Sequence, residues 1–225
     1  MSSNKDRLKI YHKFAEQCSI IALSGKAPVE VNWTKWCTKI REFHEDDFFA
    51  NGTLRNAGLA CGPASNRLVL DVDNLELFSS VRRRYGWRIP KTFIVRTGSG
   101  KRHYYFKYPG DGNEYKNKAM PTLGIDLRGL GGQVVIPGSI HPETAELYTV
   151  YKDRPVVSPP GWLLQLYQEE RHTPTIKSLK IQEEIKSLII EGIPDNIRQS
   201  GALVSKIVRS LVWAGRDDEQ IYWVF

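Results

Sequence analysis

The chain has 225 residues, of which 41% are hydrophobic and 25% charged, and its 32 Lys and Arg exceed its 25 Asp and Glu. This balance is typical of a globular chain and excludes a disordered protein, a collagen-like repeat and a membrane bundle. No apolar run approaches the roughly 20 residues of a membrane-spanning helix. The formal net charge of +7 favours polyanionic partners such as nucleic acid, anionic lipid or phosphorylated substrates.

The N-terminal part is predicted to combine helices with short extended segments. Apolar residues recur at helical spacing from Lys5 to Leu23, so we expect one helix there, ended by Ser24-Gly25. A second helix is expected over residues 44–50, closed by Asn51-Gly52. Residues 56–59 are then expected to form a short strand.

The middle of the chain is predicted to be rich in strands. The apolar run of residues 68–73 indicates a buried strand, and a helix is expected over residues 75–85. The remaining predicted strands, of which the first two form a hairpin, are 92–96, 102–106, 125–128, 133–136 and 147–150. The predicted class is α+β, a mostly antiparallel or mixed sheet flanked by helices.

The composition changes after residue 156, where a closing helix over residues 162–169 ends the first domain. We predict a domain over residues 1–170, a linker over 171–175 and a small helical bundle over 176–225. The last residues form an apolar face with nothing after it, so we expect the chain to be the front part of a longer polypeptide.

Cysteine usage and the N-terminus favour a cytoplasmic protein. The three cysteines, Cys18, Cys37 and Cys61, are odd in number and form no C-x-x-C pair. They suit neither a disulfide framework nor a zinc site, so we expect no zinc. The first residues run into a polar helix and lack the apolar core of a signal peptide.

Positive charge is concentrated in one stretch, residues 82–107, called the basic segment below. It carries nine Lys and Arg and no Asp or Glu, which exceeds the net charge of the whole chain. Interleaved tyrosine and tryptophan residues favour a nucleic-acid surface over a solvated basic face. The candidate contacts are Arg82, Arg83, Arg84, Arg88, Lys91 and Arg96.

Two aspartates end the predicted buried strand. Asp71 and Asp73 are two residues apart, so in a strand they project from the same face. Adjacent carboxylates repel each other unless a cation compensates, and hard oxygen ligands suit Mg²⁺ or Mn²⁺. The alternative is an acidic strand end that faces water.

Three further segments carry groups that could bind an anion. The turn from Thr97 to His103 contains two glycines followed by Lys101 and Arg102, although it matches no Walker motif. Asp126 and Arg128 share one strand face, and an intrastrand ion pair is the alternative there. His141 lies in a loop, where a histidine with satisfied hydrogen bonds is the alternative.

Three segments, in their order along the chain, resemble the three motifs of the archaeo-eukaryotic primase superfamily. They are Leu70–Asp73, Ser99–His103 and Ile125–Asp126. More closely, residues 8–168 are similar to the bifunctional primase-polymerase domain of plasmid, phage and mobile-element replication proteins. Residues 176–225 look like the small helical domain that often follows this unit. The supporting segments are Gly25–Pro28 with Trp33 or Trp36, Asn56–Leu59, Gly62–Ser65 and Gly138–Pro142.

The resemblance implies nucleotidyl transfer by two Mg²⁺ or Mn²⁺ ions held by Asp71, Asp73 and Asp126. It implies that His103 donates to a phosphate oxygen. It further implies a nucleotide pocket with contributions from Ser99, Lys101, Arg102, Arg128, Ser139 and His141.

The implied activity is a DNA primase and polymerase that makes primers de novo from dNTPs or NTPs and extends them on single-stranded DNA. The implied partners are template, primer, nucleotides and a helicase domain or protein, with no membrane. The implied location is the prokaryotic cytosol or the cytosol of the element's host. Two alternatives remain: a polymerase-beta-type nucleotidyltransferase, and a non-catalytic replication-origin or single-stranded-DNA-binding protein.

Overall fold

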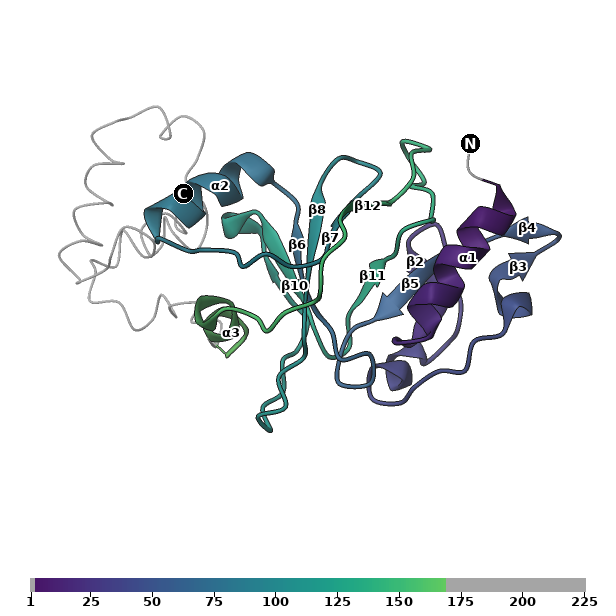
Figure 1. Ribbon diagram of the computed structural model, residues 1–225, viewed down its shortest axis with the longest axis horizontal. Coiled ribbons are helices and arrows are strands. Elements are labelled where there is room, and N and C mark those ends of the chain that lie inside the picture. The colour runs from purple at the N-terminus through teal and green to yellow at the C-terminus, as the bar shows by residue number, and fades with distance from the viewer. Residues whose placement is uncertain (1–2, 169–225) are drawn as a thin grey trace, which may run out of the picture. The chain divides into compact units, whose positions relative to one another are not determined.

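Three α-helices and three antiparallel sheets make up residues 3–168, the part of the chain that the computed structural model describes (Figure 1). This arrangement confirms the predicted α+β class. The predicted linker and helical bundle lie outside the described residues. Among residues 3–168, no helix has the length and apolar character needed to cross a bilayer.

One half of this unit is a four-stranded sheet against helix α1 (Asn4–Ala15). Helix α1 begins at Ser3, whose hydroxyl accepts a hydrogen bond from the backbone N–H of Asp6 as an N-cap. Tyr11 of α1 is fully buried in the core against the sheet. In spatial order the strands are β11 (Gln133–Val135), β5 (Asn56–Ala60), β1 (Ile20–Ser24) and β2 (Ala27–Pro28).

The single helix predicted over residues 5–23 is wrong, because α1 ends at Ala15 and residues 20–24 form β1. Ile20 to Leu23 are four consecutive buried residues, and a short continuous apolar run fits a strand buried on both faces. The helical spacing of α1 continues into this apolar run, so periodicity alone does not separate the helix from the strand.

The helix predicted over residues 44–50 is also corrected. Residues Glu45–Phe48 form a 3₁₀ turn, and β3 (Phe49–Ala50) pairs with β4 (Thr53–Leu54). Asn51 and Gly52 have φ of 49° and 74°, the positive values that a tight two-residue hairpin turn requires. The pair therefore closes a hairpin rather than a helix.

The other half is a six-stranded antiparallel sheet whose central strand carries Asp71 and is followed directly by Asp73. Its strands in spatial order are β12 (Thr149–Lys152), β7 (Ile94–Arg96), β8 (Arg102–Phe106), β6 (Leu68–Val72), β10 (Ile125–Arg128) and β9 (Lys118–Met120). Strands β6 and β8 lie where they were predicted. The last strand begins two residues later than predicted, and β9 was not predicted.

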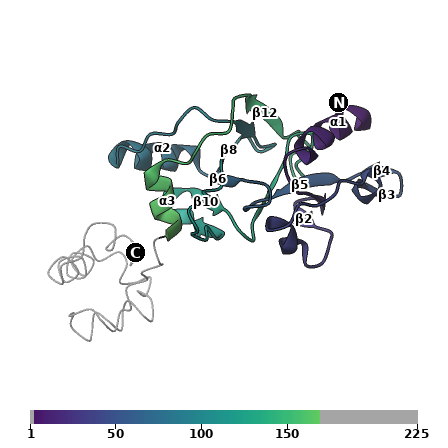
Figure 2. The same cartoon turned by 60° about the horizontal axis from the view of Figure 1, so that its bottom comes forward.

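The two faces of this sheet pack against different cores. Helices α2 (Leu75–Arg84) and α3 (Gly161–Gln168) contribute to one core, together with Leu68 and Leu70 of β6. Val69 of β6 instead joins the core that contains α1 and the four-stranded sheet. Figures 1 and 2 show α2 and α3 at one end of the described unit and α1 at the other. Residues 68–70 of β6 are all apolar because the strand is covered on both faces there.

Arg7 fixes α1 to the loop that follows β11, although its side chain is charged and only 4% of it is exposed. Its Nε donates to the carbonyl of Gly138 over 2.6 Å, and Nη2 donates to the carbonyl of Arg55 over 3.2 Å. We predict that Arg7→Ala lowers the free energy of unfolding by about 3 kcal/mol, because these buried acceptors lose a charged donor. Urea denaturation measures the change.

Lys9 is the matched control for that prediction, since it lies on the same helix and is exposed, with Nζ 4.0 Å from Asp6. Lys9→Ala should change the free energy of unfolding by no more than about 0.5 kcal/mol. Equal urea midpoints for the two variants would contradict the role given to Arg7.

Candidate functional site

Three polar residues form one row across the six-stranded sheet. Asp71 of β6 lies directly opposite His103 of β8 on one side and Asp126 of β10 on the other. Directly opposite residues of antiparallel strands project from the same face. Because Leu70 and Val72 beside Asp71 face the core of α2 and α3, the row lies on the other face of the sheet.

Asp73 comes just after β6, in the turn that leads into α2. Its backbone N–H donates to the carbonyl of Gly124 over 2.9 Å, and the next residue, Asn74, caps α2 by accepting from the N–H of Leu77. These contacts hold the turn against the start of β10. The turn after β6 therefore positions Asp73. The strand alternation expected from the sequence does not extend to this residue.

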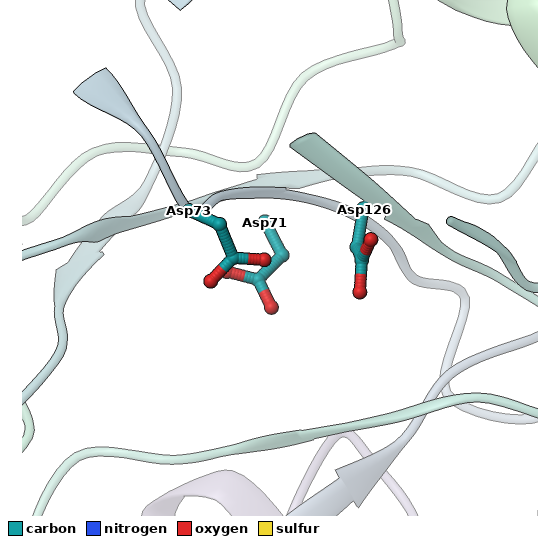
Figure 3. Close-up of side chains that lie close together, drawn as sticks. All are labelled: Asp71, Asp73 and Asp126. Carbon is teal, nitrogen blue, oxygen red and sulfur yellow. The ribbon is translucent and has the colours of Figure 1, made fainter. Parts of the chain in front are cut away.

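The three carboxylates converge as predicted. One oxygen from each of Asp71, Asp73 and Asp126 lies within 4.8 Å of the others. Figure 3 shows the three side chains pointing to the same side, two from β6 and its end and one from the neighbouring strand. This group is called the acidic cluster below.

Three cationic or potentially cationic side chains border the acidic cluster. Lys101 Nζ lies 2.8 Å from Oδ1 of Asp73, and His103 Nε2 lies 3.3 Å from Oδ1 of Asp71. Arg128 donates to Asp126, and its Nη2 lies 3.6 Å from Oδ2 of Asp71. The predicted ion pair of Asp126 with Arg128 is therefore present, and it is part of a larger network.

The electrostatics differ among the acids. Burial raises the pKa of Asp71, but the charge and hydrogen bond of His103 and the charge of Arg128 outweigh it, so the pKa is lowered overall. Burial raises the pKa of Asp126, and the charges of Asp73 and Asp71 add to this against Arg128. The hydrogen bond to Asp73 raises the pKa of Lys101. Asp126 is therefore repelled by the negative charges of Asp73 and Asp71, and Arg128 does not fully compensate for burial and this repulsion.

The donor set of the acidic cluster fits a divalent metal. Three carboxylates offer only hard oxygen ligands, which suit Mg²⁺ or Mn²⁺, whereas zinc sites are built largely from cysteine and histidine. Burial, together with the charges of Asp73 and Asp71, raises the pKa of Asp126, and a bound cation would offset these charges. The residues present therefore fit a magnesium or manganese site.

We predict that Mn²⁺ raises the melting temperature of the protein. A metal that binds only the folded state at 100 times its Kd adds about 2.7 kcal/mol of stability. In Asp126→Asn the shift should disappear, while the metal-free variant should melt no lower than the wild type because the repulsion at this position is removed. Thermal unfolding with Mn²⁺ or with EDTA measures both, and an equal shift in the variant would contradict the site.

The turn between β7 and β8 places Lys101 beside the cluster, but it does not bring Arg102 there. Thr97 Oγ1 accepts from the N–H of Lys101 and hydrogen bonds with the Ser99 hydroxyl, both over 3.0 Å. Arg102 alternates with His103, so its side chain lies on the opposite face of the sheet. There its guanidinium covers the ring of Tyr151 at 4.1 Å.

Ser139 and His141 lie in the loop that follows β11, and His141 packs closely against Gly98 of the β7–β8 turn. Ser139 is fully buried, and its hydroxyl accepts from the N–H of Ala57 over 3.0 Å. His141 is 2% exposed, and its Nδ1 accepts backbone N–H groups of Glu143 and Thr144 over 3.3 Å each. Burial lowers the pKa of His141. Both residues thus use polar atoms to hold the protein's own loops.

Tyr148 is a neighbour of the site that sequence reasoning missed. Its ring lies 6.1 Å from that of His103 and 6.0 Å from that of His141. Burial, followed by the charge of Asp71, raises the pKa of Tyr148 to about 12. A tyrosine in a predicted strand carries no functional signal, because only the fold places it beside His103.

Four of the six positive residues predicted to contact nucleic acid lie away from the face of the acidic cluster. Arg82, Arg83 and Arg84 form the last turn of α2, which covers the opposite face. Arg96 alternates with Val95, which pairs with His103 and shares its face, so Arg96 lies on the α2 side. Arg88 and Lys91 lie in the connection between α2 and β7.

An acidic cluster with oxygen donors on an antiparallel sheet, bordered by Lys, His and Arg, is the kind of site that metal-dependent enzymes acting on nucleotides use. The chain belongs to the bifunctional DNA primase/polymerase family: the model of that family's N-terminal domain matches residues 12–162. This confirms the resemblance for the first domain, and the family is one of metal-dependent nucleotidyltransferases that act on DNA and nucleotides. No match was found among curated proteins.

Proposed function

We propose that the protein is a template-directed DNA primase and polymerase. It makes primers de novo on single-stranded DNA and extends them from dNTPs or NTPs during replication of a plasmid, phage or other mobile element. The observation that carries this proposal is the convergence of Asp71, Asp73 and Asp126, whose oxygens lie within 4.8 Å of one another. Membership of the primase/polymerase family supports it.

In this proposal, Asp71, Asp73 and Asp126 hold two Mg²⁺ or Mn²⁺ ions. When bound, such ions stabilise the charge on the attacking and leaving oxygens of a phosphoryl transfer. The role of the protein is to keep three carboxylates ionised and aligned. The Asp71–Asp126 register and the contacts of His103 and Arg128 provide that alignment.

The triphosphate is proposed to lie beside the same cluster. Lys101 and Arg128 are charged donors beside the carboxylates, His103 is a further donor there, and Ser99 lies at the tip of the adjoining turn. Such groups neutralise the phosphate oxygens and orient them for transfer. Ser139 and His141 support this arrangement through hydrogen bonds with the backbone N–H groups of Ala57, Glu143 and Thr144.

We predict that His103→Ala raises the KM for the incoming nucleotide about tenfold to a hundredfold, since a buried donor to a charged group contributes about 1.5–3 kcal/mol. Arg102→Ala is the matched control, because Arg102 is the next residue and lies on the opposite face. Primer extension at varied dNTP concentration measures KM. Equal effects of the two variants would contradict the proposed role of His103.

Template DNA is proposed to follow the basic segment, which includes Arg82 and Arg96. Because these residues lie on the α2 side, the strand would contact a different face from the nucleotide and reach the cluster around an edge of the sheet. Contacts to phosphates make binding fall steeply with salt. A helicase partner and a cytoplasmic location remain predictions.

Primer synthesis on circular single-stranded DNA, with labelled nucleotides and Mn²⁺ or Mg²⁺, tests the proposed function. The wild type should make primers without an added primer, and Asp71→Ala/Asp73→Ala should make none. Unchanged synthesis by that variant would reject the catalytic assignment. DNA binding by a wild type that makes no primers would favour the non-catalytic alternative. The antiparallel Asp71–Asp126 pairing counts against the polymerase-beta alternative.

A further inference from the structure

A large cavity lies beside the site, between α1 and the six-stranded sheet, and the proposed reaction does not use it. Its volume is about 900 Å³, within the range of roughly 300–1,000 Å³ that small-molecule sites occupy. Aromatic side chains from distant parts of the chain line it. They are Phe14 of α1, Phe93, Tyr105 of β8 and Tyr148.

Positive side chains also line this aromatic cavity. They are Lys13, Arg67, Lys107 and Arg154, called the basic rim, against one acid, Asp153. No carboxylate among residues 3–168 forms an ion pair with any of the four. Arg67 instead donates to the Gln17 amide oxygen and to backbone carbonyls. The rim therefore has a surplus of positive charge over an apolar wall.

The cavity is distinct from the acidic cluster but lies on the same face of the sheet. Tyr105 is two residues beyond His103 on β8, so the two side chains share that face. Tyr148 lines the cavity and also lies 6.1 Å from the His103 ring. The acidic cluster itself does not line the cavity.

We propose that the aromatic cavity binds a nucleotide as a second site, separate from the one that supplies the reacting nucleotide. The base packs against the half-buried rings of Phe14 and Phe93, and the phosphates contact the basic rim. The same chemistry, a base with its 5′-phosphate, is offered by a free nucleotide and by a nucleotide of a DNA strand. The inference does not depend on the proposed catalytic function, because it concerns binding.

Titration calorimetry of the full chain in EDTA tests the proposal, with dATP in one arm and a 5′-phosphorylated (dT)₆ in the other. EDTA removes the divalent metal that the acidic cluster is proposed to hold. The test variant is Lys13→Glu/Arg154→Glu, which reverses two charges of the basic rim that lie outside the basic segment. Lys5→Glu/Lys39→Glu makes the same charge change at exposed positions outside the cavity.

We expect the wild type to bind at least one of the two probes, with an affinity that falls about tenfold or more in the rim variant. The control variant and Asp71→Asn/Asp126→Asn should both keep wild-type affinity. Binding of dATP identifies a free nucleotide as the ligand, and binding of the oligonucleotide alone identifies a DNA strand. Absence of binding, or an equal loss in the rim and control variants, would overturn the proposal.

Phe93→Ala supplies a second readout that does not alter charge. Phe93 lines the cavity and is half-buried, so its ring is available to pack against a base. Binding should weaken in this variant about fivefold or more if the base occupies the cavity. Wild-type affinity in Phe93→Ala would show that the rim alone attracts the probe, which would reject the proposed site.

Discussion

Asp71→Asn is expected to lower the rate of nucleotide incorporation by about three orders of magnitude, or about 4 kcal/mol of transition-state stabilisation. The central position of Asp71 is the reason, since it lies opposite both His103 and Asp126. Removing its charge takes away a metal ligand and leaves His103 without its carboxylate partner. Steady-state primer extension with saturating Mn²⁺ measures the loss.

Asp46→Asn is the matched control, because Asp46 is an exposed acid in the 3₁₀ turn of residues 45–48. It should keep wild-type incorporation. Circular dichroism should show that both variants are folded. A folded Asp71→Asn protein with more than about one tenth of the wild-type rate would contradict the role of Asp71 as a metal ligand.

Gly129→Ala is expected to destabilise the protein by about 3 kcal/mol, the upper part of the range for overpacking a core. A Cβ at Gly129 would lie 2.0 Å from the carbonyl oxygen of Tyr115. That oxygen already accepts from the N–H of Leu130 over 2.7 Å, so the backbone cannot move aside without breaking this bond. Because Gly129 directly follows β10, the variant should also displace Asp126 and reduce activity.

Gly110→Ala is the control for that substitution, since a Cβ there meets nothing within 4 Å. It should leave stability unchanged or raise it by about 0.5 kcal/mol through the unfolded state. Urea denaturation compares the two variants. If Gly129→Ala unfolds at the same urea concentration as Gly110→Ala, the close contact with Tyr115 does not hold β10 in place.

Much of the six-stranded sheet could be predicted because its signals are local. Residues 68–70 are apolar since both faces of β6 are buried there, and the glycine turn before residue 102 marks the β7–β8 hairpin. The N-terminal region was harder. The apolar residues of β1 continue the helical spacing of α1, so the boundary at Ala15 depends on pairing with β5, which is distant in sequence.

The acidic cluster could be predicted from motif order and resemblance, but its geometry could not. The row of His103, Asp71 and Asp126 depends on the register of three strands, which no short segment encodes. Arg102 is a residue that motif matching assigned to the nucleotide pocket and that the structure places elsewhere. It lies within a charged motif, yet strand alternation places it on the other face.

Anomalous diffraction from crystals soaked in Mn²⁺ and a non-hydrolysable dNTP shows directly whether the three aspartates hold metal. We expect manganese ions coordinated by oxygens of Asp71, Asp73 and Asp126, with the triphosphate against Lys101 and His103. Manganese bound elsewhere while these three carboxylates contact only Lys101, His103 and Arg128 would contradict this expectation.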